Sequence, residues 1–166
     1  MIRPVLQYPD PRLTRKSVEI KEITPEIREL AADMVETMYA RDGIGLAAPQ
    51  VGEAVRLITM DVSGPEKREA LHILVNPKLT LGPGEVASEE GCLSVPELRA
   101  DVYRAPRVTL DATDLDGKPI HLELDELPAI CLQHECDHLE GTLFIDRISR
   151  LKRMMYDRKI DKKAHK

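Results

Sequence analysis

The chain has 166 residues, a formal net charge of −5 and 42% hydrophobic residues, enough for one domain with a sizeable core. No apolar run approaches the ~18 residues that a membrane helix needs, so we expect no membrane contact. Three cysteines without an apolar N-terminal leader indicate a reducing compartment, the cytoplasm.

The first predicted helix runs from Thr24-Pro25 to Asp42-Gly43. Threonine is a favourable N-cap, and proline suits the first helical position. Apolar residues at helical spacing form one stripe between these ends. The stripe should face the core and consists of Ile27, Leu30, Ala31, Met34, Val35 and Met38.

The segment 43–50 reads Gly-Ile-Gly-Leu-Ala-Ala-Pro-Gln. It lacks the Gly-Lys-Ser/Thr ending and the glycine spacing of phosphate-binding loops. Its two glycines would let the backbone of a substrate approach closely. The alternative is a turn that stops the helix and leads into a packed crossing.

Four strand-like runs follow, at 55–60, 72–76, 108–112 and 120–124, with a turn signal at Asp116-Gly117. Between the second and third runs, Cys92 lies between Gly91 and Pro96 in a segment typical of a tight loop or a strand end. A thiolate could be presented there. The segment alone slightly favours the alternative, a small buried apolar residue.

A helix over about 128–140 carries the pentapeptide His-Glu-Cys-Asp-His at 134–138. Pro128 suits its first turn and Gly141 its end. Histidines four residues apart lie on one helix face, about 5–6 Å apart at Cβ, so both can reach one metal ion. Glu135, about 100° around the helix, would stand beside the metal as a general base. The motif also arises by chance, and its helical context favours the metal site.

A catalytic metal needs a third protein ligand. Cys136 lies about 200° around the helix from His134 and should point away. Cys131 shares the histidine face, but it lies about 10.5 Å along the axis from His138, too far for one ion with bonds of about 2.0–2.3 Å. We therefore expect Cys131 to be an apolar wall residue, which leaves Cys92.

The last helix is predicted from about Ser149. From Arg147 onward the chain has nine basic and two acidic residues, a net of +7, whereas the remainder has 15 basic and 27 acidic residues, a net of −12. The tail suits either an anionic partner or a solvated helix face. For docking, Leu151, Met154 and Met155 would pack on the body. Six basic residues would then be free for phosphates: Lys152, Arg153, Arg158, Lys159, Lys162 and Lys163.

Helices and strands are segregated along the chain, which predicts an α+β fold. We expect an antiparallel sheet packed around the central metal-binding helix, with an N-terminal helix and a C-terminal helix. A catalytic body would span 1–148, and a basic helical tail of the same domain would span 149–166.

Three segments together resemble peptide deformylase. That family carries G-x-G-x-A-A-x-Q, E-G-C-L-S and Q-H-E-x-D-H, which 43–50, 90–94 and 133–138 match in that order without departure. The resemblance extends from Val5 to the helix after Phe144 and is far more specific than the histidine motif alone. It implies that Cys92 joins His134 and His138 as a metal ligand.

The resemblance implies a hydrolase that removes the formyl group from the N-formylmethionine of newly synthesised polypeptides and releases formate. Water activated by one divalent metal ion would attack the formyl carbon, with Glu135 as general base and then acid. The Gln50 side chain and the Leu93 N–H would stabilise the oxyanion. Fe²⁺ is implied in the cell, and Zn²⁺, Ni²⁺ or Co²⁺ in purified protein.

Family analogy also implies a set of substrate-binding residues and a structural ion pair between Glu90 and Arg104. The substrate-binding set is Ile44, Gly45, Glu90, Gly91, Arg99, Leu127, Ile130 and Cys131. An extended substrate would pair with residues 44–45 as an added strand. The implied partners of this monomer are nascent N-formylmethionyl peptides and the ribosome, bound through rRNA by the basic helix.

Two other functions compete with this one. An endopeptidase with the same histidine motif usually takes its third ligand from downstream of the helix, whereas Cys92 lies upstream. A non-enzymatic ribosome-binding module would close a structural metal site with four ligands, and the sequence offers no convincing fourth.

Overall fold

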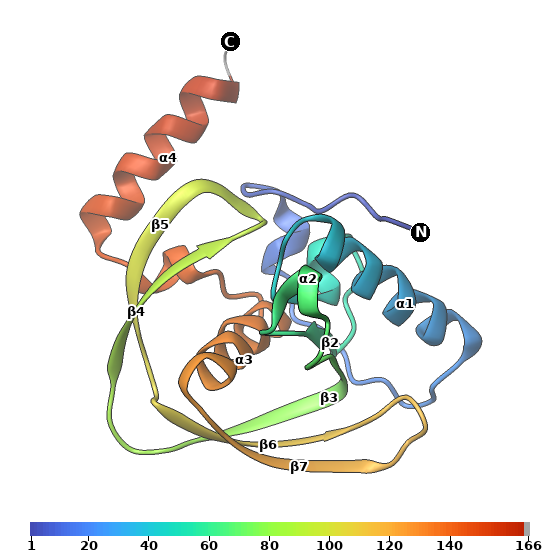
Figure 1. Cartoon of the computed structure of the whole chain (residues 1–166). Helices are drawn as coiled ribbons and strands as arrows, with labels where there is room; N and C mark the ends of the chain where they lie inside the picture. The colour runs from blue at the N-terminus through green and yellow to red at the C-terminus, as the bar shows by residue number, and fades with distance from the viewer. Residues whose placement is uncertain (165–166) are drawn as a thin grey trace.

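The computed structural model describes residues 1–164 (Figure 1). In chain order, the elements within these residues are the 3-10 helix η1 (Pro11–Thr14), α1 (Pro25–Ala40), β1 (Gly45–Ala47), the 3-10 helix η2 (Ala48–Val51), β2 (Leu57–Met60), α2 (Gly64–Lys67), β3 (His72–Leu81), β4 (Val86–Cys92), β5 (Val95–Arg104), β6 (Arg107–Thr113), β7 (Pro119–Asp125), α3 (Glu126–Leu139), the 3-10 helix η3 (Phe144–Arg147) and α4 (Arg150–Ala164).

The predicted α+β fold is confirmed, and its strands are antiparallel. Five of them form a sheet in the order β1-β2-β3-β6-β7, while β4 and β5 form a separate two-stranded sheet. Helix α3 contacts every strand of the larger sheet and lies at the centre of the molecule (Figure 1). Strands β1, β4 and β5 were not predicted.

Helix α1 has the predicted start and the predicted core stripe. Thr24 caps it by accepting a hydrogen bond from the N–H of Ile27, and Pro25 occupies its first position. Leu30, Met34 and other stripe residues are buried against β1 and β2. The segment 43–50, which follows this helix, therefore lies against a buried and well-packed part of the protein.

Strand β3 continues past the predicted end at residue 76. Asn76 has a φ of 51°, and its side chain bonds both the N–H and the C=O of Ile20. The register with β6 shifts between Val75 and Lys78, so Pro77 lies in a bulge where it interrupts no regular ladder bond.

The β4–β5 hairpin has a two-residue turn, because Cys92 pairs with Val95. Cys92 is the last residue of β4. Of the two positions expected from the sequence, a tight loop or a strand end, the structure shows the strand end. Along β5, Ala100, Val102 and Arg104 alternate inward and are buried. The apolar members pack with Phe144 and other residues in a cluster of their own beside α3.

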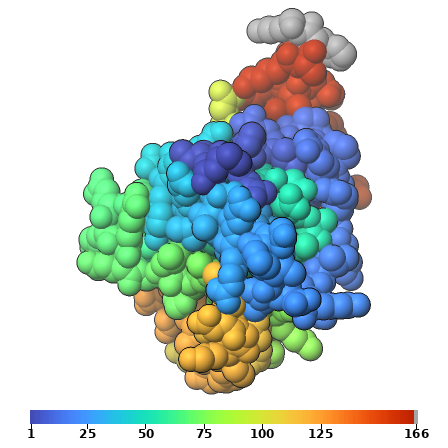
Figure 2. Space-filling view, turned by 90° about the vertical axis from the view of Figure 1, so that its right-hand side faces the viewer, coloured from blue at the N-terminus to red at the C-terminus, as the bar shows by residue number. Residues whose placement is uncertain are grey.

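Helix α4 begins at Arg150, one residue after the predicted start at Ser149. The prediction of which helix face packs on the body was wrong. The expected packing residues are exposed: 66% for Leu151, 49% for Met154 and 61% for Met155. Tyr156 is only 4% exposed and packs in the apolar cluster that contains Val102 and Phe144. The helix is turned so that its one aromatic residue is buried. Figure 2 shows α4 as a projection from the body. Residues 165–166 of the predicted tail lie outside the described part of the chain.

A search of the described residues finds no helix with the length and apolar character that membrane crossing requires.

Candidate metal centre

Three donor side chains converge between α3 and the end of β4. One ligand atom from each of Cys92, His134 and His138 lies within 4.8 Å of the others. His138 Nε2 is 3.4 Å from Cys92 Sγ. The helix supplies both histidines at the i, i+4 spacing, and the hairpin brings in the thiol from 42 residues upstream of His134.

The end of α3 is fixed by a glycine that no other residue could replace without strain. Gly141 has a φ of +77°, and a Cβ there would lie 2.4 Å from the carbonyl oxygen of Thr14. The chain can thus turn away immediately after the helix that carries His138.

A carboxylate orients the first histidine. Glu90 Oε1 lies 2.9 Å from His134 Nδ1, so the other ring nitrogen is left for the centre. Both carboxylate oxygens of Glu90 also accept from Arg104, at 2.9 and 2.8 Å, and Arg104 bonds Asp137 on the outer side of α3. Burial raises the pKa of Glu90, but the bonds from Arg104 and His134 lower it to about 2.

The charges around the three donors fit a bound cation. Burial disfavours the charged form of His134, yet its bonds with Cys92 and Glu90 raise its pKa well above the ordinary value. The ionised carboxylate of Glu90 places a negative charge next to His134. Burial lowers the pKa of His138, which keeps that ring in the neutral form that binds metals. A thiolate with two imidazoles suits Zn²⁺ and other divalent transition metals.

Glu135 stands beside these donors without belonging to their group. It is buried, its Oε1 has no hydrogen-bond partner within residues 1–164, and burial raises its pKa to about 7. A Cβ on Gly45 would lie 2.6 Å from Glu135 Oε2 and 2.9 Å from Cys131 Sγ. Gly45 is thus the residue that leaves room for the glutamate carboxylate.

Gln50 presents its amide N–H₂ towards the centre. Its Oε1 accepts from the N–H of Ala47, which fixes the orientation of the amide. Its Nε2 then donates to Ser94 Oγ at 3.1 Å and lies 3.6 Å from Cys92 Sγ. Ser94, which sequence reasoning missed, is fully buried, and its N–H lies 3.4 Å from the same sulfur.

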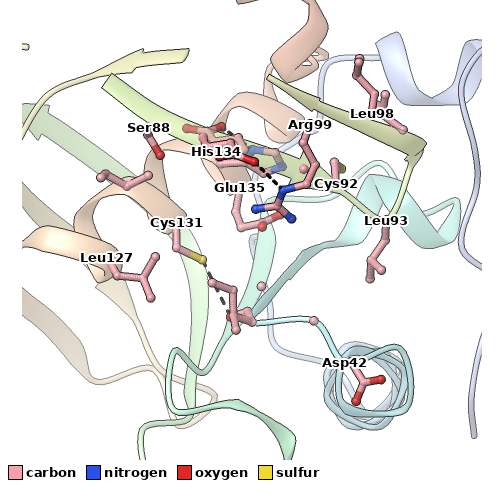
Figure 3. A pocket seen from close by; sticks show the side chains of 18 of the residues that line it. Asp42, Ser88, Cys92, Leu93, Leu98, Arg99, Leu127, Cys131, His134 and Glu135 are labelled. Carbon is pink, nitrogen blue, oxygen red and sulfur yellow. Dashed lines mark hydrogen bonds and ion pairs between the residues drawn. The ribbon is translucent and has the colours of Figure 1, made fainter. Parts of the chain in front are cut away.

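A cavity of about 710 Å³ opens onto these groups (Figure 3). Leu127 and Cys131 from the α3 side and Leu93 from the hairpin turn lie on different sides of it, and Arg99 comes from β5. Every proposed site residue except His138 lines it. The lining includes Ile44, Gly45, Gln50, Glu90, Gly91, Cys92, Leu93, Arg99, Leu127, Ile130, Cys131, His134 and Glu135.

The positions of the other two cysteines, Cys131 and Cys136, agree with those expected from helix geometry. Cys131 is buried in the cavity wall, with Sγ 3.8 Å from the carbonyl oxygen of Ile44. Cys136 borders a different cavity on the far side of α3. Glu90 lines the cavity, but its carboxylate accepts from Arg104 and lies against His134. It is therefore not free to contact a molecule in the cavity.

Comparison with known proteins gives one consistent family. A model of the polypeptide deformylase family matches residues 2–154. The chain is 42% identical to a peptide deformylase from Legionella pneumophila, with a TM-score of 0.92 over 99% of this chain and 96% of that one. It is 35% identical to a Thermotoga maritima peptide deformylase, with a TM-score of 0.84 over 90% and 99%. An Ehrlichia chaffeensis peptide deformylase in complex with actinonin is 37% identical, with a TM-score of 0.88 over 98% and 97%.

Proposed function

This chain belongs to the peptide deformylase family, enzymes that act on N-formylmethionine peptides, and we propose that Cys92, His134 and His138 hold its catalytic metal. The observation that carries the proposal is the cluster of three donors next to the buried Glu135, whose Oε1 has no hydrogen-bond partner in the described part of the chain. Three protein donors, among the residues that the structure describes, leave a coordination position for water, as catalytic sites require.

A divalent ion at these donors would polarise the formyl carbonyl and make water a nucleophile at neutral pH. We propose Fe²⁺ in the cytoplasm, with Zn²⁺, Ni²⁺ or Co²⁺ in purified protein, since sulfur and imidazole ligands accept all four.

Glu135 takes the proton that the attacking water loses and delivers it to the leaving amine. Glu135 lines the cavity, and its Oε1 has no hydrogen-bond partner within residues 1–164, so its carboxylate is free to exchange a proton. A pKa near 7 suits a group that must both accept and release a proton.

Gln50 Nε2 and the N–H of Leu93 stabilise the oxyanion that forms at the formyl carbon. The bond from Ala47 holds the Gln50 amide in the donating orientation before substrate arrives. Leu93 is the first residue of the two-residue turn, directly after Cys92. Donors fixed in advance need no reorganisation during the reaction.

The substrate lies along the free edge of β1. Because β1 is an edge strand of the sheet, the backbone of Gly45 is open to an added strand, whereas the carbonyl oxygen of Ile44 already accepts from the N–H of Asp61. The methionine side chain would then enter the cavity and pack against its apolar wall, which Leu127, Ile130 and Cys131 form. Gly91 and Arg99 border the path of the residues that follow.

We predict a strong preference for methionine at the first position. Formate release under anaerobic conditions with added Fe²⁺ is measured for Ala-Ser peptides headed by formyl-Met, formyl-norleucine and formyl-Gly. One missing or altered group in an apolar pocket costs about 1–3 kcal/mol, so norleucine should remain within about 200-fold of methionine and glycine should be the poorest. Equal kcat/KM for formyl-Met and formyl-Gly would contradict the pocket, and no formate from any peptide would contradict the function.

We also propose that the monomeric enzyme docks on the ribosome through rRNA contacts of α4. Lys152, Arg158 and Lys162 are exposed, and no carboxylate within residues 1–164 pairs with them. By contrast, Arg153, Lys159 and Lys163 pair with carboxylates of the protein. The expectation that all six would be free was therefore wrong.

Changing Lys152, Arg158 and Lys162 together to alanine should abolish ribosome co-sedimentation and leave turnover of short peptides unchanged. Each lost phosphate contact should also reduce the log–log salt slope by about 0.7–0.9. The control is Lys159→Met/Lys163→Met, which removes two lysines that pair with Glu97 of the body. Unchanged co-sedimentation of the triple variant would mean that the charges only solvate the helix. This test replaces truncation at 149, which would remove the buried Tyr156.

A further inference from the structure

Without α4, the charged side chains at the rim of the cavity would have a net negative charge. Asp42, Glu89, Glu97 and Arg99 all border the cavity, and Figure 3 shows Asp42 at the end of α1 and Arg99 on β5. Arg99 Nε bonds Glu89 Oε1 at 3.1 Å, so these two charges cancel. Asp42 and Glu97 remain, a net of −2.

Two lysines of α4 reach this rim and cancel that charge. Lys159 Nζ lies 3.4 Å from Glu97 Oε2, and Lys163 Nζ pairs with the same oxygen. The hydrogen bond from Lys163 is the main reason that the pKa of Glu97 is lowered, and Lys159 adds to it. Counting both lysines, the rim has three acidic and three basic groups.

The position of these lysines is fixed by the anchor of α4 on β5. Tyr156 is buried, and its hydroxyl donates to the carbonyl oxygen of Pro96 at 3.0 Å, one residue before Glu97. The lysines lie one and two helical turns after Tyr156, and Tyr8 packs against its ring and bonds Asp157. The basic helix is therefore attached to the strand that forms the cavity rim.

We propose that Lys159 and Lys163 set the charge preference of the substrate cavity. By neutralising Glu97, they let the enzyme accept peptides with acidic residues after formylmethionine, which the acidic body would otherwise repel. This inference rests on the proposed function. It gives part of the basic tail a role at the site, separate from any contact with an anionic partner.

The test compares kcat/KM for formyl-Met-Ala-Glu and formyl-Met-Ala-Lys. In Lys159→Met/Lys163→Met, the ratio should shift about three- to tenfold towards the lysine peptide at low salt, because the variant leaves two net negative charges at the cavity rim. The shift should shrink as salt is added. Adding Glu97→Gln to this variant removes one of its two net negative charges, so it should recover about half of the shift on a logarithmic scale, which a merely structural loss would not do.

The matched control is Lys152→Met/Lys162→Met, which removes the same charge from the outer face of the same helix. An equal shift in the control, or no shift in Lys159→Met/Lys163→Met, would overturn the inference, as would a ratio that does not move back at all when Glu97→Gln is added. Formyl-Met-Ala-Ser reports the basal reaction. If the unmodified enzyme released no formate from it, the proposed function would fail together with this inference, whereas turnover with an unchanged ratio overturns the inference alone.

Discussion

Glu135→Ala is expected to reduce kcat by about 10²–10⁴ while the protein keeps its metal ion, because general acid–base catalysis contributes roughly that factor. The three converging donors do not include Glu135, so metal binding should not depend on it. Its Oε1 has no hydrogen-bond partner among the residues that the structure describes, so the substitution breaks no hydrogen bond of that atom there. The loss should therefore appear in proton transfer.

Metal content and formate release must be measured on the same preparation. Glu135→Gln is the matched variant, because it keeps the volume that Gly45 leaves open and removes only the basic carboxylate. Both variants should bind one ion per chain and turn over slowly. Loss of metal together with activity in both would show that Glu135 is a ligand or holds one in place.

Helix α3 and its shared histidine face could be predicted because the information for them is local. Pro128, the two histidines and Gly141 define a helix and a shared face within a single segment. Helical geometry also assigned Cys131 to the wall of the cavity. These conclusions need only the rise and rotation of a helix.

The position of Cys92 beside the two histidines and the β4–β5 hairpin could not be derived in that way. The approach of Cys92 to His138 depends on how a hairpin packs against α3, which no spacing rule predicts. The hairpin itself was missed because its buried positions include Ala100, Arg104 and Glu90, which do not give an apolar alternation. Arg104 and Glu90 are buried because they pair with each other and support His134.

The orientation of α4 shows a different limit of sequence reasoning. The apolar residues Leu151, Met154 and Met155 suggested a packing face, but one buried tyrosine with a hydrogen bond to β5 decides the orientation. Carboxylates on the body add to it by pairing with Arg153, Lys159 and Lys163. Propensity within the helix contains no information about those partners.

Cys92→Ser is expected to lower metal affinity by more than about 100-fold, since loss even of a residue that only supports a ligand costs 10–100-fold. Cys131→Ser should keep the metal and change only the preference between formyl-Met and formyl-norleucine, because its sulfur faces the carbonyl of Ile44 in the cavity wall. Competition with a chelator measures affinity. The sulfur-to-metal absorption of the Co²⁺ form should disappear in Cys92→Ser and persist in Cys131→Ser. The reverse pattern would reject Cys92 as the ligand and with it the proposed metal site.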